Sequence, residues 1–215
     1  MLNLFSTFDP CTGMMSLNWL SSLTMMLMMN YSFWTSMNNY MNFIMKITLL
    51  IKKELKMILK EKGSSIIFIS ISMFILINNM MGLLPYIFTS SSHLSFSLAM
   101  ALPMWMSFMV YGWTKKTNSM FTHLLPNGTP MMLMPFMVMI ETISNMIRPG
   151  SLAVRLTSNM IAGHLLMSLL GNSCSLMKTL IIMMTFIMLM MFETAVSLIQ
   201  SYVFMILTTL YSSEI

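Results

Sequence analysis

The sequence predicts an all-α integral membrane protein with about five membrane-crossing helices and one amphipathic surface helix. Of its 215 residues, 57% are hydrophobic and only 8% are charged. Its mean hydropathy is +0.78, far above that of soluble globular domains. Apolar segments of roughly 20 residues, the length that crosses about 30 Å of hydrocarbon, recur along the chain. Because little length remains outside them, we expect a single membrane domain over residues 1–215.

The first half of the chain contains three predicted spans and the surface helix. Apolar residues dominate residues 14–33, the first expected span. Over residues 46–62, apolar side chains recur every three or four positions opposite most of the lysines, as in a helix lying flat on a membrane. A solvated helix packed on another subunit would show the same pattern. Residues 66–84 and 93–113 are the next spans, and Pro103 is tolerated inside the second, as in many membrane helices.

Two long apolar segments, residues 130–170 and 176–210, end the chain and are expected to form a hairpin. A helix of roughly 35 to 40 residues is about 52 to 60 Å long, so each must tilt steeply or bend to fit the bilayer. We expect the bend of the first segment at Pro149 and Gly150.

The basic residues predict an orientation in the membrane. The lysines of residues 46–62 and of the Lys115-Lys116 pair fall on the same side if five segments cross and the first starts outside. The N-terminus is then outside and the C-terminus inside. The net charge of +5 therefore suits a membrane surface rather than nucleic acid. The first ten residues lack the features of a secretory or transit signal, and the 34 methionines indicate synthesis inside an organelle with a biased genetic code.

Metal, hydrolytic and nucleotide sites find no support in the sequence. His93, His123 and His164 lie in separate segments without metal-ligand spacing. Asp9 is the sole aspartate, which disfavours a Ser-His-Asp site, and no phosphate-binding loop is present. We therefore expect no cofactor, no metal and no catalytic site within this chain.

One arginine, Arg155, lies inside the apolar stretch from Gly150 to Gly171. A guanidinium stays charged in proteins and costs about 2.5 to 3.5 kcal/mol at the centre of a membrane helix, so it needs a partner or a function. Steps of three or four residues define a stripe that passes through it: Glu141, Asn145, Arg148, Leu152, Arg155, Asn159 and Ala162. For Asn145 or Thr157 alone, hydrogen bonding between neighbouring helices is the favoured explanation.

Helical spacing separates the titratable groups from the arginine. His164 follows Arg155 by nine positions, which at about 100° per residue places it on the opposite face. Glu193 and Gln200 share one face of the last helix, and in an antiparallel hairpin Glu193 can approach His164. Carboxylate and imidazole exchange protons near neutral pH, whereas arginine cannot relay one. Glu141 offers a second titratable site on the other side of Arg155, so the pattern suits a proton path interrupted by a fixed cation.

Two segments carry a specific family resemblance. Arg155 to Leu166 (RLTSNMIAGHLL) and Glu193 to Phe204 (ETAVSLIQSYVF) closely resemble the subunit a family of F-type ATP synthases in its mitochondrial, arthropod-like form. The FDP at Phe8 to Pro10 and the run NNMMGLLPYIFTSSSHL from Asn78 to Leu94 are also similar to that family. The resemblance therefore covers nearly the whole chain.

The resemblance implies a stator in the mitochondrial inner membrane that presses two tilted helices against a rotating ring of c subunits. The peripheral-stalk subunit b and other small membrane subunits are implied partners. The N-terminus then lies in the intermembrane space and the C-terminus in the matrix. Arg155 matches the family's arginine, which holds the ring carboxylate ionised and blocks a proton short circuit. The other matching positions are His164 and Glu193 in the intermembrane-space half-channel, Glu141 in the matrix half-channel, and Asn159 and Gln200 near the arginine.

Two other functions stay open from the residues alone. A self-contained proton or ion transporter subunit of another membrane complex would need a binding site in paired broken helices, and we find no internal repeat of that kind. A purely structural membrane scaffold would keep ATP-coupled proton pumping intact when Arg155 is replaced by alanine.

Overall fold

The structure is a computed structural model that describes residues 4–11, 15–23, 38–59, 63–125, 128–173 and 179–214. Within these residues it contains helices and turns and no β-strand, which confirms the predicted all-α class. The long helices are α2 (Asn39–Ile58), α3 (Ser64–Gly82), α4 (Leu94–Lys115), α6 (Met134–Asn172) and α7 (Thr179–Glu214). The short ones are η1 (Leu4–Phe8), η2 (Leu17–Leu20), η3 (Ser90–Ser92), α5 (Thr117–His123) and η4 (Met131–Leu133).

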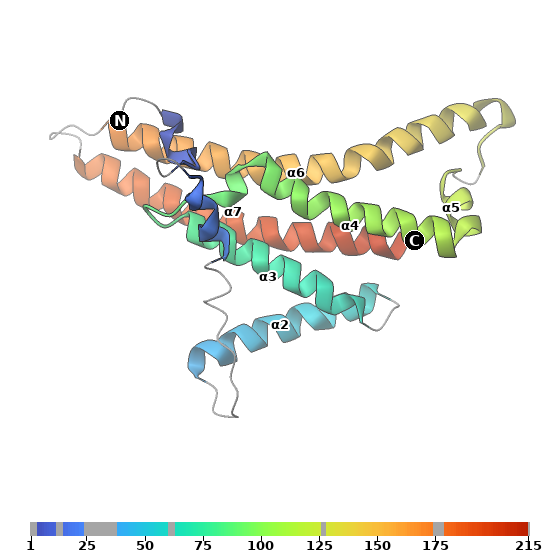
Figure 1. Cartoon of the computed structure of the whole chain (residues 1–215), viewed down its shortest axis with the longest axis horizontal. Coiled ribbons are helices and arrows are strands. Elements are labelled where there is room, and N and C mark those ends of the chain that lie inside the picture. The colour runs from blue at the N-terminus through green and yellow to red at the C-terminus, as the bar shows by residue number, and fades with distance from the viewer. Residues whose placement is uncertain are drawn as a thin grey trace.

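The two C-terminal helices form the hairpin around which the other helices pack. Figure 1 shows α6 and α7 side by side near the loop that joins them and farther apart toward the other end, where α4 lies against α6. Helix α3 packs along α7. The core where these four helices meet consists of Ile75, Ala101, Leu152, Ala153, Leu156 and Phe204. Its alanines let neighbouring helix backbones come close, as small residues do between membrane helices.

Helix α2 is amphipathic, as its sequence predicts, and lies against one side of the bundle (Figure 1). Leu55 is fully buried against Phe68 of α3 and Met205 of α7, while the lysines of α2 are exposed. Leu50, expected on the apolar face, is instead 61% exposed. Because the helix begins at Asn39, it is longer than the predicted segment 46–62.

Three described helices are long and apolar enough to cross a membrane: α3, α4 and residues Thr179–Ser213 of α7. The first two correspond to the predicted segments 66–84 and 93–113. Helix α6 is not among them, because Arg155, Asn159 and His164 lower the hydropathy of its apolar part. Most of the first predicted span, residues 14–33, lies outside the described residues.

One connection contains a helix that the sequence does not predict, whereas α6 bends, as expected for a segment longer than the bilayer is thick. The polar residues 117–130, which precede the predicted segment 130–170, contain the helix α5, whose last turn carries His123. Pro149, expected to mark a bend, lies within α6, which continues through it. Figure 1 shows that α6 bends without breaking, consistent with a proline whose freed backbone group is satisfied by neighbouring helices.

Candidate functional site

The polar stripe of α6 moves from the inside of the bundle to the outside. Glu141, Asn145 and Arg148 are half-buried, whereas Arg155 and Asn159 are exposed. The residues of the stripe are 3.5 positions apart on average, whereas an α-helix has 3.6 residues per turn. The stripe therefore rotates around the helix by about 20° per seven residues, or about 60° over its whole length. The drift helps to place the two arginines of this helix in different surroundings.

Arg148 and Arg155 differ in their partners. Arg148 places its Nη2 atom 3.4 Å from Oε1 of Glu141 and its guanidinium carbon 5.2 Å from the ring centre of Tyr211. The guanidinium of Arg155 makes no hydrogen bond or ion pair with any residue in the described part of the chain. The charge of Arg148 is therefore satisfied within this chain, whereas that of Arg155 is presented on the outer face of α6.

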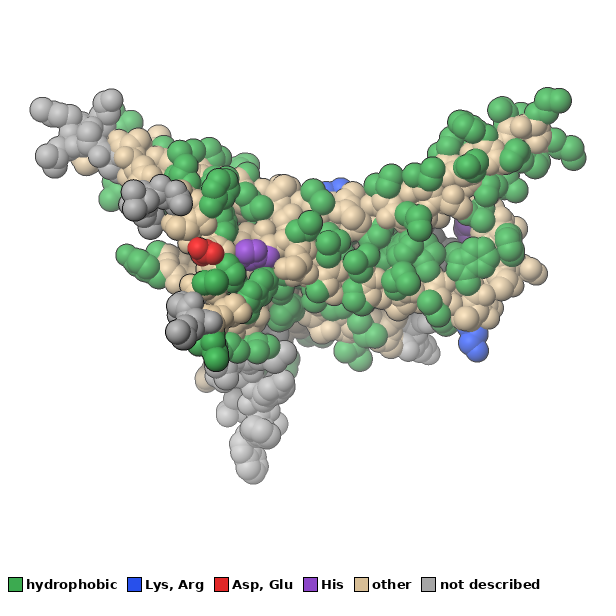
Figure 2. Space-filling view, turned by 45° about the horizontal axis from the view of Figure 1, so that its top comes forward, with side chains coloured by type: hydrophobic (Ala, Val, Ile, Leu, Met, Phe, Trp, Pro, Cys, Tyr) green, Lys and Arg blue, Asp and Glu red, His purple; other side chains and the backbone are tan. Residues whose placement is uncertain are grey.

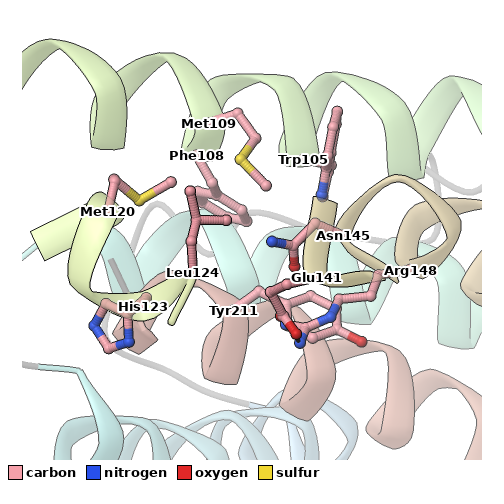
Figure 3. Close-up of a pocket in the computed structure, with 10 residues that line it drawn as sticks. All are labelled: Trp105, Phe108, Met109, Met120, His123, Leu124, Glu141, Asn145, Arg148 and Tyr211. Carbon is pink, nitrogen blue, oxygen red and sulfur yellow. Dashed lines mark hydrogen bonds and ion pairs between the residues drawn. The ribbon is translucent and has the colours of Figure 1, made fainter. Parts of the chain in front are cut away.

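The Glu141 and Arg148 pair lines a cavity of about 250 Å³. Figure 3 shows the two side chains pointing toward each other beside Tyr211, with His123 of α5 on the far side of the cavity. Asn145 lies between them and the wall that α4 forms. The sequence did not predict His123 as a residue of this cavity, because the residues that form α5 are polar and lie outside the predicted spans.

A second cavity, of about 360 Å³, is lined by residues of α3, α6 and α7. Glu193, Gln200 and Asn79 line it, and all three are at least nine-tenths buried. Asn159 on α6 donates a hydrogen bond from Nδ2 to Oε1 of Gln200, at 3.1 Å. Asn159 and Gln200, each predicted to lie near Arg155, are thus joined directly and tie α6 to α7 one turn beyond Arg155.

Gly163 lets the carboxyl group of Glu193 come against the backbone of α6. A Cβ atom at this position would lie 2.5 Å from Oε1 and 2.7 Å from Cδ of Glu193. Any larger side chain would have to displace the carboxyl group, since real Cβ contacts are not that short. The glycine therefore permits the position that Glu193 occupies.

His164 follows this glycine but does not bond to Glu193. Nε2 of His164 and both carboxyl oxygens of Glu193 are buried without a hydrogen-bond partner among the described residues. The imidazole meets the ring of Phe8 edge-on, with ring centres 6.2 Å apart. The hairpin thus places both predicted titratable groups beside Gly163, with no direct hydrogen bond between them.

The unpartnered buried atoms gather at one end of the molecule. In the described residues there are seven of them: Asn78 Nδ2, Asn79 Nδ2 and Oδ1, Ser91 Oγ, His164 Nε2, and Glu193 Oε1 and Oε2. They come from the end of α3, the η3 turn, the second half of α6 and the first half of α7. An unsatisfied buried polar group costs about 1 to 3 kcal/mol, so such a cluster is typical of a region that takes up water.

Asn78, Asn79 and Ser91 were not predicted as site residues. The adjacent asparagines inside an apolar segment were the signal that could have indicated two of them, because amides in membrane helices are costly without partners. Among the described residues, no three His, Cys, Asp or Glu side chains come together in a way that could hold a metal ion.

These features define a class: an all-helical membrane protein whose long helices carry carboxyl, imidazole, amide and guanidinium groups within apolar segments. Residues 4–213 match the model of the ATP synthase A chain family. Proteins named ATP synthase subunit a are similar over the whole chain and 99% of their own length. They include those of Anopheles quadrimaculatus and Drosophila melanogaster, each 54% identical, and of Aedes albopictus, 53% identical. The chain belongs to the ATP synthase A chain family and is a membrane-sector subunit of that complex, which confirms the predicted resemblance.

Proposed function

We propose that this chain conducts protons across the mitochondrial inner membrane through two offset half-channels that meet at a rotating c ring. The observation that carries the proposal is the exposed guanidinium of Arg155, which lacks a partner in the described residues. Along α6 it lies between two cavities that each contain a glutamate. A charge on an apolar helix face is costly unless it is paired. The carboxylate of a c subunit is a suitable partner from outside this chain.

The inlet half-channel is the cavity that contains Glu193 and Asn79, together with His164. Carboxyl and imidazole groups take up and release protons near neutral pH. The unpartnered polar atoms around them support a water-filled approach from the end of the molecule where α6 and α7 are joined. In the proposed orientation this end faces the intermembrane space, as does the N-terminus.

The outlet half-channel is the cavity beside Glu141 and Arg148. The carboxylate of Glu141 faces this cavity beside the guanidinium of Arg148. In the proposed path it takes the proton that leaves the passing ring and passes it toward His123 and the matrix. The basic residues of α2 and the Lys115-Lys116 pair at the end of α4 support this side as the matrix side, which also contains the C-terminus.

Arg155 separates the two half-channels. Because a guanidinium cannot give up its proton, it attracts an ionised ring carboxylate but does not relay a proton. One proton moving through 100 mV releases about 2.3 kcal/mol, and a leak past Arg155 would dissipate that energy without rotation. The hydrogen bond between Asn159 and Gln200 orients the neighbouring surface on which the ring carboxylate arrives.

The remaining parts of the proposal concern the chain as a whole. It forms one membrane domain with five crossing helices, including α6, and it has no catalytic site because ATP chemistry takes place on other subunits. Its partners are the c ring, the peripheral-stalk subunit b and small membrane subunits, with the lipid bilayer around them. The relatives named ATP synthase subunit a support these assignments.

The test replaces the two carboxyl groups separately in the assembled ATP synthase reconstituted in liposomes. We expect Glu193→Gln and Glu141→Gln each to slow proton conduction roughly 100-fold, the lower range for loss of a group that transfers protons, while the complex still assembles. Glu54→Gln is the control, because Glu54 is an exposed carboxylate on α2 outside both cavities. Normal conduction in Glu193→Gln or Glu141→Gln would remove that residue from the path.

A further inference from the structure

The N-terminal segment, residues 4–11, lies against α6 at the end that contains the proposed inlet. Phe8 covers the imidazole of His164 edge-on, with ring planes at 87°. On the face shown in Figure 2, apolar side chains are spread over much of the surface, and an acidic and a histidine side chain lie close together near this end. The segment is therefore in contact with a proposed proton-path residue, although it is far from that residue in sequence.

A histidine that the proposed function does not use holds this segment in place. Nε2 of His93 lies 3.0 Å from the backbone oxygen of Phe8. A carbonyl oxygen can only accept a hydrogen bond, so Nε2 is the protonated nitrogen of this ring. Asn18 adds a second anchor one residue later, because its Nδ2 donates to the backbone oxygen of Asp9 at 3.2 Å.

Two aromatic rings fix the imidazole of His93. The indole ring of Trp19 is centred 5.1 Å away, and the ring of Phe88 stacks on it at 5.2 Å. Such ring pairs add orientation to burial. His93 therefore has a defined position from which to hold the carbonyl of Phe8, and it directly follows the η3 turn with its buried Ser91.

We propose that His93 is a positioning residue that holds Phe8 over His164. Phe8 then closes the outer side of the His164 imidazole, so that this ring exchanges protons with the polar interior that contains Glu193 and not directly with the outer surface. Nε2 of His164 is buried and has no hydrogen-bond partner among the described residues, as this arrangement requires. This inference rests on the proposed proton path, because the cover by Phe8 closes that path at its outer end.

The loss of one hydrogen bond should increase the open population of the segment roughly three- to tenfold. The test measures how fast diethyl pyrocarbonate modifies His164 in the intact ATP synthase, by mass spectrometry of the peptide that contains it. We expect His93→Phe, which keeps the ring stacking but loses the donor, to increase the rate about three- to tenfold. His93→Gln keeps an N–H donor and should restore the slow rate.

A second variant keeps the test independent of His93 itself. Phe8→Ala should increase the modification rate at least as much as His93→Phe, and the double variant should add little, because both changes remove the same cover. ATP-driven proton pumping should fall in each single variant and recover in His93→Gln. A merely structural role would lower the amount of complex without changing the reactivity of His164 within it.

The inference is wrong if His93→Phe and Phe8→Ala leave the modification rate unchanged, or if His93→Gln behaves like His93→Phe. That outcome does not affect the proposed proton path, provided that Glu193→Gln still slows conduction roughly 100-fold. If Glu193→Gln and Glu141→Gln both conduct normally while the cover over His164 is confirmed, the proposed function fails and the positioning role of His93 remains as a structural fact.

Discussion

At the scale of single residues, the same side chain has different uses at two positions of α6. Arg148 has an acidic partner and an aromatic ring within the chain, whereas the guanidinium of Arg155 has no polar partner among the described residues. The sequence could predict that Arg155 was costly, since a charge in an apolar segment needs an explanation. It could not predict that Arg148 pairs with Tyr211 from the far end of α7, because that contact depends on how the helices pack.

Gly163→Ala should displace the carboxyl group of Glu193. The added Cβ would lie 2.5 Å from Oε1, so the carboxyl group, at the end of a flexible side chain, has to move away from the backbone of α6. We expect proton conduction to fall while most of the complex still assembles, measured as ATP-driven acidification in liposomes. Gly150→Ala on the same helix is the control, because its Cβ would meet no atom within 4 Å. Equal effects of the two changes would contradict the account.

Asn79→Leu tests whether the buried amide of Asn79 takes part in a water path for protons or only fills space between helices. The amide of Asn79 is fully buried and has no hydrogen-bond partner among the described residues. Replacing it with an apolar group of similar size should leave stability unchanged or increased, yet we expect proton conduction to fall several-fold. Ser72→Ala on α3 is the control, since that buried hydroxyl is satisfied by the carbonyl of Ile69. Unchanged conduction in Asn79→Leu would exclude the amide from the path.

At the scale of helices, the sequence predicts much of the arrangement because apolar length and helical spacing are local properties. Helices α3 and α4, the hairpin of α6 and α7, and the shared buried face of Glu193 and Gln200 all follow from them. Helix α5 and the early start of α2 do not, because short polar segments become helical through contacts that lie elsewhere in the chain. The meeting of Asn79 with Glu193 likewise requires α3 to pack on α7.

Gln200→Leu should weaken the contact between α6 and α7. It removes the hydrogen bond that joins Gln200 to Asn159, and such bonds between membrane helices contribute about 0.6 kcal/mol on average and up to about 1.7. The temperature at which this chain dissociates from the complex should fall by a few degrees. Tyr202→Phe removes a more exposed bond to Glu54 on α2 and should lower the dissociation temperature less. A larger decrease in Tyr202→Phe than in Gln200→Leu would show that the contact with α2, and not the contact with Asn159, holds α7.

At the scale of the whole molecule, the chain exposes large apolar side chains along α6 and α7. Phe136, Met146, Leu166, Met188 and Phe192 are each more than half exposed. A face of this kind needs lipid or another protein around it. Leu166 lies eleven residues beyond Arg155, which at about 100° per residue places both on the same side of α6.

Leu166→Cys carrying a photoreactive label should cross-link to a c subunit in the assembled complex. We expect the adduct on gels and by mass spectrometry. Met57→Cys is the control, because Met57 is 90% exposed on α2, away from the hairpin face. A label at Leu166→Cys that reaches only lipid or another subunit would contradict the proposed ring-facing surface.

The most direct test of the proposed function replaces Arg155 with alanine in the purified, liposome-reconstituted ATP synthase and measures protons moved per ATP turned over. We expect coupling to be lost, because the two half-channels are no longer separated by a fixed charge, while passive proton leak through the membrane sector rises. Arg155→Lys, which keeps a positive charge without the planar guanidinium, should leak less than alanine. An Arg155→Ala complex that still couples proton flow to ATP turnover at the normal ratio would show that Arg155 is not the barrier.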